Sequence, residues 1–441
     1  MYRYRAGQGN NEYRCTVHAL AVGPADHAKS AGTARPGNNG EGLGIGCTTK
    51  LWGDTVMKRA AVMILISALL LGVLPVTGFA AEMDGKSALL MELSTGTVIQ
   101  EKNSHEKLAP ASVTKVMTML LIMEAIDAGK IHWDDPVTAS EAAAAKGGSQ
   151  IYLKVGEVMT VSDMLKSIAV SSANDCACAM AEHLAGSESA FVERMNQRAQ
   201  ELEMQDTHFV NCTGLDDGPD AQSHRTSAHD IAIMSRELLQ KHPDIKKFTT
   251  IWMDTVRDGA FGLSNTNRLV RFYQGATGLK TGFTRGAGFC LSASAQRDGM
   301  ELIAVVMGAE SSKGRFAACK SMLDYGFANY ALATPELPEN PSVPVILGQE
   351  KTVNVQLGQT EGLLIDKAQR GSITSDLRLE ESVAAPVAQG QQLGTLTMQA
   401  GDQVLAEIPL VSQQAVEKLT WGEIFVSILG RTAMAKQSTD A

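Results

Sequence analysis

The chain is organised around the stretch Ala109-Pro-Ala-Ser-Val-Thr-Lys-Val-Met-Thr-Met-Leu-Leu-Ile-Met-Glu-Ala-Ile126. Residues 116–126 are apolar on nearly every side, so a helix formed there is buried rather than laid on the surface. Ser112 lies where that helix is expected to begin, just after Pro110, and Lys115 follows one turn later. Because residues three apart share a helix face, the lysine amine can reach the serine hydroxyl. The pair supplies a nucleophile and an adjacent base.

The base works only if the lysine is neutral. A buried helix start, with positive charge nearby, is expected to lower the pKa of Lys115. A second Ser-x-x-Lys, Ser104-His-Glu-Lys107, lies in a polar segment with no apolar helix after it. Since such a motif means little without its structural context, we expect no catalytic role for the second one.

Two further elements carry the side chains that a serine nucleophile needs around it. Ser172-Ala-Asn174 falls at a turn between two predicted helices, where a hydroxyl and an amide can project into a site. Lys280-Thr-Gly282 falls on a predicted strand. Each alone has an ordinary interpretation, as a helix cap or a solvated strand residue. Together, and in these settings, they favour catalysis.

The Lys280 segment has three expected contributions. Lys280 is expected to help keep Lys115 neutral by like-charge repulsion. With Thr281 it can hold a carboxylate. Gly282 is expected to let a substrate backbone approach closely.

Composition describes an exported globular protein with room for two or three domains. The 441 residues are 44% hydrophobic and 20% charged, which is ordinary for a globular chain. Met57-Lys-Arg59, an uncharged run and Gly78-Phe-Ala80 form the three zones of a secretory signal over residues 57–80, with cleavage expected after Ala80. The uncharged run is too short to span a membrane comfortably. Residues 1–56 precede this signal and show no periodicity; our hypothesis is that translation begins at Met57, and a cytoplasmic tail is the alternative.

Charge and cysteine content exclude two classes of protein. The net charge is −9, and removal of the more basic leader makes the mature chain more acidic still. Nucleic-acid binding, which needs a basic face, is therefore not expected. The five cysteines beyond the leader lack zinc-site spacing and lie mostly among apolar residues, at positions 176, 178, 212, 290 and 319. We expect structural thiols without a disulfide framework.

Hydrophobic periodicity predicts an α+β catalytic domain over residues 81–334. A β-hairpin is expected over residues 87–100, and a mainly helical block over 110–245. Strands follow at 278–283, 288–295 and 300–307, with a turn at Arg297-Asp-Gly299 between the last two, and a helix over about 313–329. The expected sheet is antiparallel, is flanked by helices, and joins strands far apart in the sequence.

The C-terminal part is predicted to be a separate small β domain with a tail. Four prolines mark a linker over residues 335–344, and residues 345–415 alternate apolar and polar side chains between glycine-containing turns. Residues 416–441 place Trp421, Ile424, Phe425 and Ile428 on one face of an amphipathic helix. That helix could lie in a membrane interface or pack back on the β domain, and the sequence favours neither.

The catalytic motifs together carry a family resemblance. Ser-x-x-Lys, Ser-x-Asn and Lys-Thr-Gly form the set of the penicillin-binding and serine β-lactamase superfamily. The chain looks most like the low-molecular-mass serine D-alanyl-D-alanine carboxypeptidases, from about Lys86 to its C-terminus. Two residues depart from the pattern: Cys212 stands where proline is expected, and Phe283 where some members carry histidine. The segments that carry the resemblance are Pro110-Ala-Ser-Val-Thr-Lys115, Ser172-Ala-Asn-Asp175, Asn211-Cys-Thr-Gly-Leu-Asp216 and Gly278-Leu-Lys-Thr-Gly282.

The resemblance implies a β-lactamase/transpeptidase-like fold and an acyl-enzyme route that needs no metal or cofactor. The implied substrate is the peptidoglycan stem peptide, the implied inhibitors are β-lactams, and the implied location is the outer face of the cytoplasmic membrane or the cell wall. The resemblance implies that Ser112 is the nucleophile, Lys115 its base, and Ser172 with Lys280 a proton relay. It also implies that Asn174 binds the substrate backbone, and that Lys280 and Thr281, on the strand that contains Gly282, bind the terminal carboxylate. The backbone N–H groups of Ser112 and Phe283 would stabilise the oxyanion.

Three alternatives remain open to different degrees. A DD-endopeptidase that cuts cross-links would use the same motifs. A β-lactamase commonly needs a glutamate that positions water, and no counterpart is evident between Ser172 and Lys280. A non-catalytic penicillin sensor or wall-binding protein would have no need of Lys115 and Ser172.

Overall fold

The catalytic domain is built on a five-stranded antiparallel sheet. The structure is a computed structural model that describes residues 83–358, 362–426 and 428–429. The predicted signal and the segment before it lie outside these residues. The predicted hairpin and the three later strands are confirmed and form one sheet, in the order β2 (Val98–Lys102), β1 (Ser87–Glu92), β9 (Met300–Ala309), β8 (Gly288–Arg297) and β7 (Ala276–Thr284).

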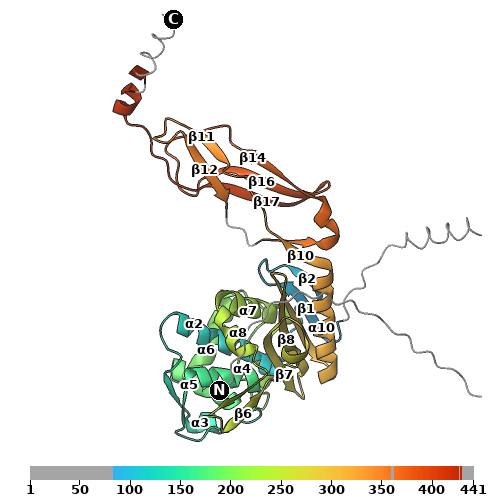
Figure 1. Ribbon diagram of the computed structural model, residues 1–441. Helices are drawn as coiled ribbons and strands as arrows, with labels where there is room; N and C mark the ends of the chain where they lie inside the picture. Colours follow the sequence, from blue (N-terminus) through green and yellow to red (C-terminus); the bar gives the residue numbers. More distant parts are fainter. Residues whose placement is uncertain (1–82, 359–361, 427, 430–441) are drawn as a thin grey trace, which may run out of the picture. The chain divides into compact units, whose positions relative to one another are not determined.

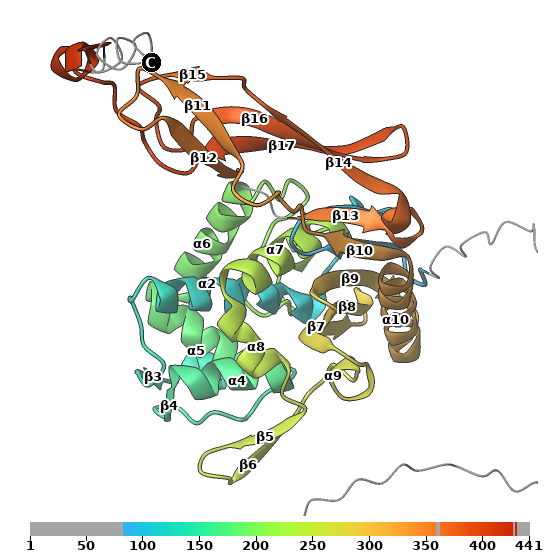
Figure 2. The ribbon, with the colours of Figure 1, turned by 45° about the horizontal axis from the view of Figure 1, so that its top comes forward.

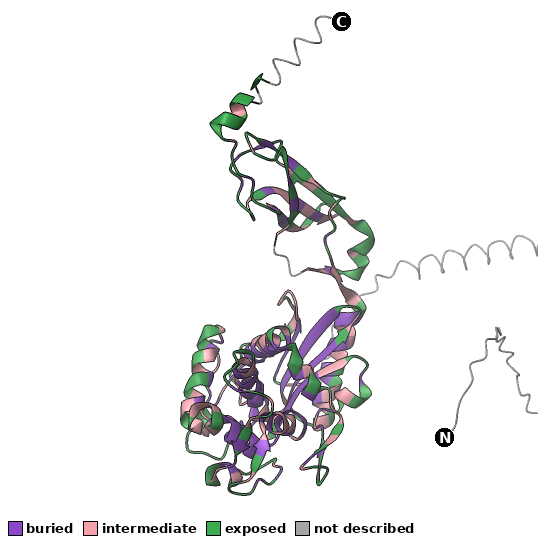
Figure 3. Cartoon of the chain, turned by 60° about the vertical axis from the view of Figure 1, so that its left-hand side comes forward, coloured by how far each residue is buried: buried purple, intermediate pink, exposed green. Residues whose placement is uncertain are grey.

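Both faces of this sheet are covered by helices (Figures 1 and 2). On β1, Leu89 packs into the core shared with the helical block, whereas Leu90 packs into the core beneath α10 (Ser312–Asn329). Ile303 and Ala304 on β9 divide in the same way. Successive strand residues face opposite sides, so continuous apolar strands bury both faces. Figure 3 shows the resulting buried centre.

The helical block between β2 and β7 follows the predicted periodicity closely. Side chains of Thr160, Ser187 and Ser227 accept hydrogen bonds at the helix starts that they precede, as N-cap residues do. The block contains η1 (Ala111–Thr114), α2 (Lys115–Asp127), α3 (Glu141–Ala144), α4 (Val161–Ser171), α5 (Asn174–Ala185), α6 (Glu188–Glu201), η2 (Ala221–Ser223), α7 (Ala228–Lys241), η3 (Pro243–Ile245), α8 (Lys246–Thr249) and α9 (Leu269–Phe272).

Two small hairpins inside the block were not predicted. One pairs β3 (Pro136–Thr138) with β4 (Val158–Thr160), and the other pairs β5 (Met253–Val256) with β6 (Phe261–Ser264). Three- and four-residue strands are too short to establish an alternating pattern in the sequence.

The start of the organising helix also differs from expectation. Ser112 lies in the tight 3-10 turn η1, and the α-helix proper begins at Lys115. Ala111 adopts the left-handed conformation, with φ of 49°. Because 3-10 geometry places residues i and i+3 in line, the predicted contact between the serine and the lysine is retained.

The C-terminal part is the expected all-β domain. Alternating valines such as Val343 and Val353 form its core. Its sheet has the order β14 (Ile373–Leu379), β16 (Gln392–Ala400), β17 (Gln403–Ser412), β12 (Thr352–Leu357), β11 (Ser342–Ile346) and β15 (Val383–Ala384), while β10 (Tyr330–Ala333) pairs with β13 (Leu363–Asp366) before η4 (Lys367–Ser372). Residues 342–344 were predicted as linker but belong to β11, since Pro344 occupies a strand register position opposite Thr352.

In the tail, residues 421–426 and 428–429 are helical. Trp421 is 88% exposed and Phe425 is exposed as well. Among the described residues, no helix has the length and apolarity to cross a membrane.

Candidate active site

The structure brings the nucleophile and its base together. Lys115 Nζ lies 3.0 Å from Ser112 Oγ and donates a hydrogen bond of 2.8 Å to the backbone carbonyl of Thr213. Lys115 is fully buried, and Ser112 is partly exposed. A neutral lysine can direct its lone pair at the serine O–H while an N–H group binds Thr213, so the geometry suits a general base.

Burial is the main reason why Lys115 can be neutral. Desolvation lowers the pKa of Lys115 from 10.5 to about 7, against opposing effects of Cys212 and Asp175. Burial also raises the pKa of the Cys212 thiol well above its usual range, so that residue is uncharged near pH 7. Asp175 is the second neighbour that limits the fall of the Lys115 pKa. The predicted lowering is confirmed, but the repulsion expected from Lys280 is not among its main causes.

Ser172 and Asn174 lie at the expected turn between α4 and α5. Ser172 ends α4 in the left-handed conformation, with φ of 61°, and Asn174 begins α5. The Asn174 amide donates to the carbonyl of Gly147 at 2.7 Å, while its buried Oδ1 has no hydrogen-bond partner among the described residues. Since buried polar atoms are normally paired, this oxygen is suited to a substrate N–H group.

Strand β7 brings the third motif against the nucleophile turn. A Cβ added to Gly282 would lie 2.7 Å from the carbonyl oxygen of Pro110 and 3.1 Å from the backbone nitrogen of Ser112. Glycine is therefore needed here for the strand to pack on the turn, and the expected approach of a substrate backbone stays a prediction. This contact places the backbone of Gly282 and Phe283 beside Ser112.

The side chains of this motif belong to the buried middle of β7. Lys280 is fully buried, and its Nζ donates 2.8 Å to the carbonyl of Thr281. Desolvation, then repulsion from Lys115 and Arg315, lowers the pKa of Lys280 well below its usual range. The Thr281 hydroxyl donates to Thr266 Oγ1 at 2.6 Å.

Two other predictions have clear outcomes. In the part of the chain that the structure describes, the Ser172 hydroxyl makes no hydrogen bond to Lys280, so the proposed relay pair is not in contact. Lys107 of the second Ser-x-x-Lys binds the Gln205 carbonyl rather than Ser104, which agrees with its expected lack of a role.

Two positioning residues were missed by sequence reasoning. Asp175, next to the Ser-x-Asn motif, is buried and accepts the backbone N–H groups of Ile151 and Leu153. Arg315, on α10, is buried and donates to the carbonyl of Gly282 at 2.7 Å. The adjacent motif was a signal for Asp175, but no local pattern singles out Arg315, because its partner is remote in sequence.

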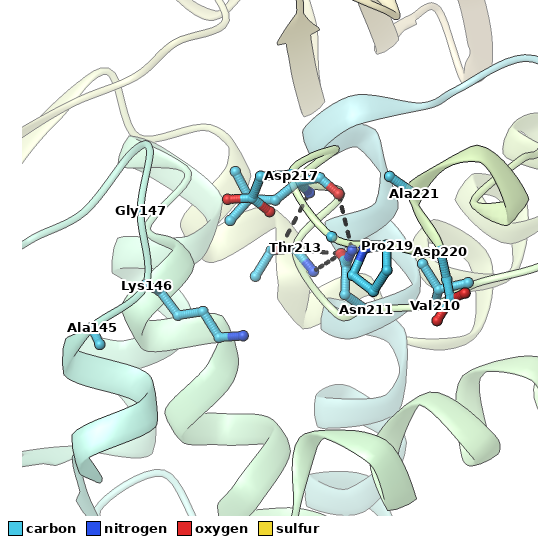
Figure 4. Close-up of a pocket in the computed structure, with 12 residues that line it drawn as sticks. Ala145, Lys146, Gly147, Val210, Asn211, Thr213, Asp217, Pro219, Asp220 and Ala221 are labelled. Carbon is cyan, nitrogen blue, oxygen red and sulfur yellow. Dashed lines mark hydrogen bonds between the residues drawn. The ribbon is translucent and has the colours of Figure 1, made fainter.

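A cavity of about 290 Å³ adjoins the site (Figure 4). Its walls are formed by residues 145–147 and 210–221, and Lys146 points from one wall toward the other. The carbonyls of Gly147 and Thr213, which hold Asn174 and Lys115, belong to these walls. The exposed carboxylates of Asp217 and Asp220 also line it.

Within the described ranges, no group of histidine, cysteine and acidic side chains is arranged to hold a metal ion. The five cysteines of the described residues are free and buried, as the sequence predicts.

Comparisons with known proteins agree with this architecture. A family model described as D-alanyl-D-alanine carboxypeptidase matches residues 75–311, and one described as the C-terminal domain of penicillin-binding protein 5 matches residues 339–418. The D-alanyl-D-alanine carboxypeptidase DacF of Bacillus subtilis is 43% identical over 393 residues, which cover 85% of this chain and 98% of that protein. DacC of Escherichia coli is 33% identical, over 78% of this chain and 88% of its own length.

A solved structure is similar to this chain over most of the length of both proteins. Penicillin-binding protein 5 of Haemophilus influenzae has a TM-score of 0.68 at 29% identity, covering 77% of this chain and 99% of that one. Fold and site together define a serine hydrolase of the penicillin-binding class. More specifically, the chain belongs to the D-alanyl-D-alanine carboxypeptidase family.

Proposed function

We propose that this enzyme removes the terminal D-alanine from peptidoglycan stem pentapeptides through an acyl-enzyme on Ser112. The observation that carries the proposal is the 3.0 Å contact between Ser112 Oγ and the buried Lys115 amine. Lys115 takes the proton from Ser112 as the hydroxyl oxygen attacks the carbonyl between the two D-alanines. The C–N bond then breaks, D-alanine leaves with a proton on its amine, and water hydrolyses the ester.

The surrounding groups each have a place in this reaction. The unpartnered Asn174 Oδ1 accepts a backbone N–H group of the peptide, and Ser172 passes a proton to the leaving amine. Lys280 and Thr281 hold the terminal carboxylate. The backbone N–H groups of Ser112 and Phe283 stabilise the tetrahedral oxyanion, an effect of roughly 3–4 kcal/mol for one donor in comparable sites. The acyl side of the peptide extends toward the cavity at residues 210–221.

β-Lactams are proposed to acylate the same serine. A strained lactam amide beside a carboxylate presents the reacting groups of the D-alanyl-D-alanine terminus. Relatives with solved structures are named penicillin-binding proteins, which supports this part of the proposal.

We propose that the enzyme acts outside the cytoplasmic membrane, in cell-wall maturation. Residues 57–80 would direct export and be removed after Ala80. Trp421 and Phe425, exposed on the tail helix, would anchor the protein in the membrane interface. Removal of residues 416–441 is expected to release the protein from the membrane fraction; unchanged fractionation would contradict this anchor.

The decisive experiment is D-alanine release from a stem pentapeptide by the full chain and by its Ser112→Ala variant. The parent is expected to release D-alanine, and the variant to fall to background, because the Ser112 hydroxyl is the one that the Lys115 amine contacts. Ser104→Ala is the matched control, since Ser104 lies in the second Ser-x-x-Lys and outside the site. Turnover by Ser112→Ala would refute the assignment. Stable penicillin labelling of Ser112 without D-alanine release would favour an endopeptidase or a sensor.

A further inference from the structure

A chain of three hydrogen bonds ends on the peptide unit that precedes the nucleophile. The Val210 backbone N–H donates to His224 Nδ1 at 3.0 Å. His224 Nε2 lies 2.8 Å from Thr114 Oγ1, and Thr114 Oγ1 donates to the carbonyl of Ala111 at 2.8 Å. His224, Thr114 and Ala111 are all buried, so these groups have little access to water.

The direction of every bond in this chain is fixed. A backbone N–H can only donate, so His224 Nδ1 must carry no proton. Thr114 spends its single proton on Ala111, so it must accept from His224 Nε2. His224 is therefore the neutral imidazole with its proton on Nε2.

Electrostatics at His224 agrees with this hydrogen-bonding pattern. Burial, followed by repulsion from His208, Arg225 and Lys115, lowers the pKa of His224 to about 4. Its ring also meets the edge of Phe209, with the ring centroids 5.7 Å apart.

The last acceptor connects the chain to catalysis. The carbonyl of Ala111 and the backbone N–H of Ser112 belong to one planar peptide unit and point in opposite directions. Holding the carbonyl therefore fixes where the Ser112 N–H points. Ala111 is left-handed, with φ of 49°, a conformation that a non-glycine residue keeps only under constraint from its surroundings.

The other side of the same carbonyl is also enclosed. A Cβ on Gly214 would lie 1.8 Å from the Ala111 oxygen. The Gly214 backbone thus packs directly on the carbonyl that Thr114 binds, and the peptide unit has little room to rotate.

We propose that His224 and Thr114 are positioning residues that orient the Ser112 N–H as an oxyanion donor. The inference rests on the proposed role of Ser112 in catalysis. Thr114 is the third residue of the Ser-x-x-Lys motif, and His224 lies 110 positions further along the chain. Under this proposal both residues affect the transition state rather than substrate binding.

The test uses Thr114→Val, which keeps the shape and removes the hydroxyl, and Thr114→Ser, which restores it. For Thr114→Val we expect penicillin acylation and kcat for D-alanine release to fall about 10- to 100-fold, part of the effect of losing one oxyanion donor. KM and the binding of product peptide should stay within about twofold, because those ground-state contacts do not use the oxyanion site. Affinity for a peptide boronate, which fills that site after adding to Ser112, should fall in parallel with kcat. Thr114→Ser should recover most of the rate.

A double-variant comparison tests the link to His224. His224→Asn retains an acceptor for Val210 but removes the donor to Thr114. If both residues act through one chain, the double variant His224→Asn/Thr114→Val is expected to be no slower than the slower single variant. Multiplicative losses would overturn the proposal.

Other outcomes would also decide the question. Three outcomes would each refute the positioning role. Thr114→Val could be acylated as fast as the parent, or it could lose product binding and rate equally. Alternatively, Thr114→Ser could be as slow as Thr114→Val. Failure of the proposed function is distinguishable, because the parent protein itself would then release no D-alanine, whether or not penicillin labels Ser112.

Discussion

The active site has two sides, each with one fully buried lysine, and their surroundings differ in charge. On the helical side, Lys115 lies near Cys212 and the Asp175 carboxylate, which limit the fall of its pKa to about 7. On the sheet side, Lys280 faces Lys115 and Arg315, which add to desolvation and hold its pKa well below the usual range. Two equally buried lysines therefore have different pKa values. Lys115 is poised to exchange a proton near neutral pH. Lys280 has only cations among the described charges that shift its pKa, and under the proposed function a substrate carboxylate would supply the opposite charge.

The largest difference should appear when each lysine is replaced by methionine. Lys115→Met removes the base while retaining an unbranched apolar side chain, so acylation of Ser112 by penicillin should fall at least about 10³-fold. The measurement is the rate of covalent labelling followed by mass spectrometry. A loss of less than about tenfold would mean that another group takes the serine proton.

The same variant should be more stable than the parent. Between pH 7 and 10.5, Lys115 is protonated in the unfolded chain and neutral in the folded chain. The free energy of unfolding therefore decreases as the pH falls toward 7. From the two pKa values this penalty is about 4 kcal/mol at pH 7. Lys115→Met removes the penalty but leaves the Thr213 carbonyl without its donor, at a cost of about 1–3 kcal/mol. Urea unfolding at pH 7 is expected to show a net gain of about 1–3 kcal/mol, and a loss would contradict the cause given for the pKa shift.

Lys280→Met should have a smaller and more selective effect. If Lys280 binds the terminal carboxylate, kcat/KM for a peptide acid should fall about 10- to 100-fold, the worth of one charge-assisted hydrogen bond. Turnover of the corresponding peptide amide, which offers no carboxylate, should change little. Because Lys280 is expected to gain a proton when the carboxylate arrives, calorimetry in two buffers should show proton uptake for the parent but not for the variant.

Lys320→Met is the control for this comparison, since Lys320 pairs with Asp324 on the solvent-facing side of α10. Equal losses for the acid and the amide substrates of Lys280→Met would show that Lys280 supports the strand rather than binding the carboxylate.

The contrast between the two sides also explains which parts could be predicted. The spacing of Ser112 and Lys115 predicted their contact, because residues three apart lie on the same face in both α- and 3-10 geometry. The five sheet strands and their flanking helices followed from long periodic segments. Contacts between distant segments could not be predicted: Arg315 binds Gly282 from α10, and the Thr213 carbonyl meets Lys115 from a loop almost a hundred residues away.

Two expectations about physical cause were incomplete for a related reason. Repulsion from Lys280 was expected to add to the burial that lowers the pKa of Lys115, and Gly282 was expected to let a substrate backbone approach. In both cases the tertiary packing decides, through complete burial of Lys115 and through the close contact of Gly282 with the Ser112 turn. Residue type and spacing identify which groups meet, but desolvation depends on all the atoms around them.

The smallest expected effect tests the carboxylate that distinguishes the helical side. Acylation requires neutral Lys115, so its rate should fall about tenfold per pH unit below about 7, the pKa of that lysine. Asp175→Asn removes the negative charge that raises this pKa, so the acid limb of the rate profile should move to lower pH. The quantity to measure is the ratio of acylation rates at pH 6 and pH 8, which should increase by a few-fold in the variant. At pH 8, Lys115 is mostly neutral in both proteins. A lower acylation rate of the variant at pH 8 would therefore come from disturbed backbone contacts of Asp175 with Ile151 and Leu153, not from the lost charge.

Asp230→Asn provides the matched control, because Asp230 is equally buried, lies in the first turn of α7 and accepts the Asp206 N–H group. Asp230 is not among the groups that shift the pKa of Lys115, so the ratio of acylation rates at pH 6 and pH 8 should remain that of the parent. An unchanged ratio in Asp175→Asn would mean that desolvation alone sets the basicity of Lys115. The difference between the two lysines would then arise on the sheet side, from the cationic neighbours of Lys280.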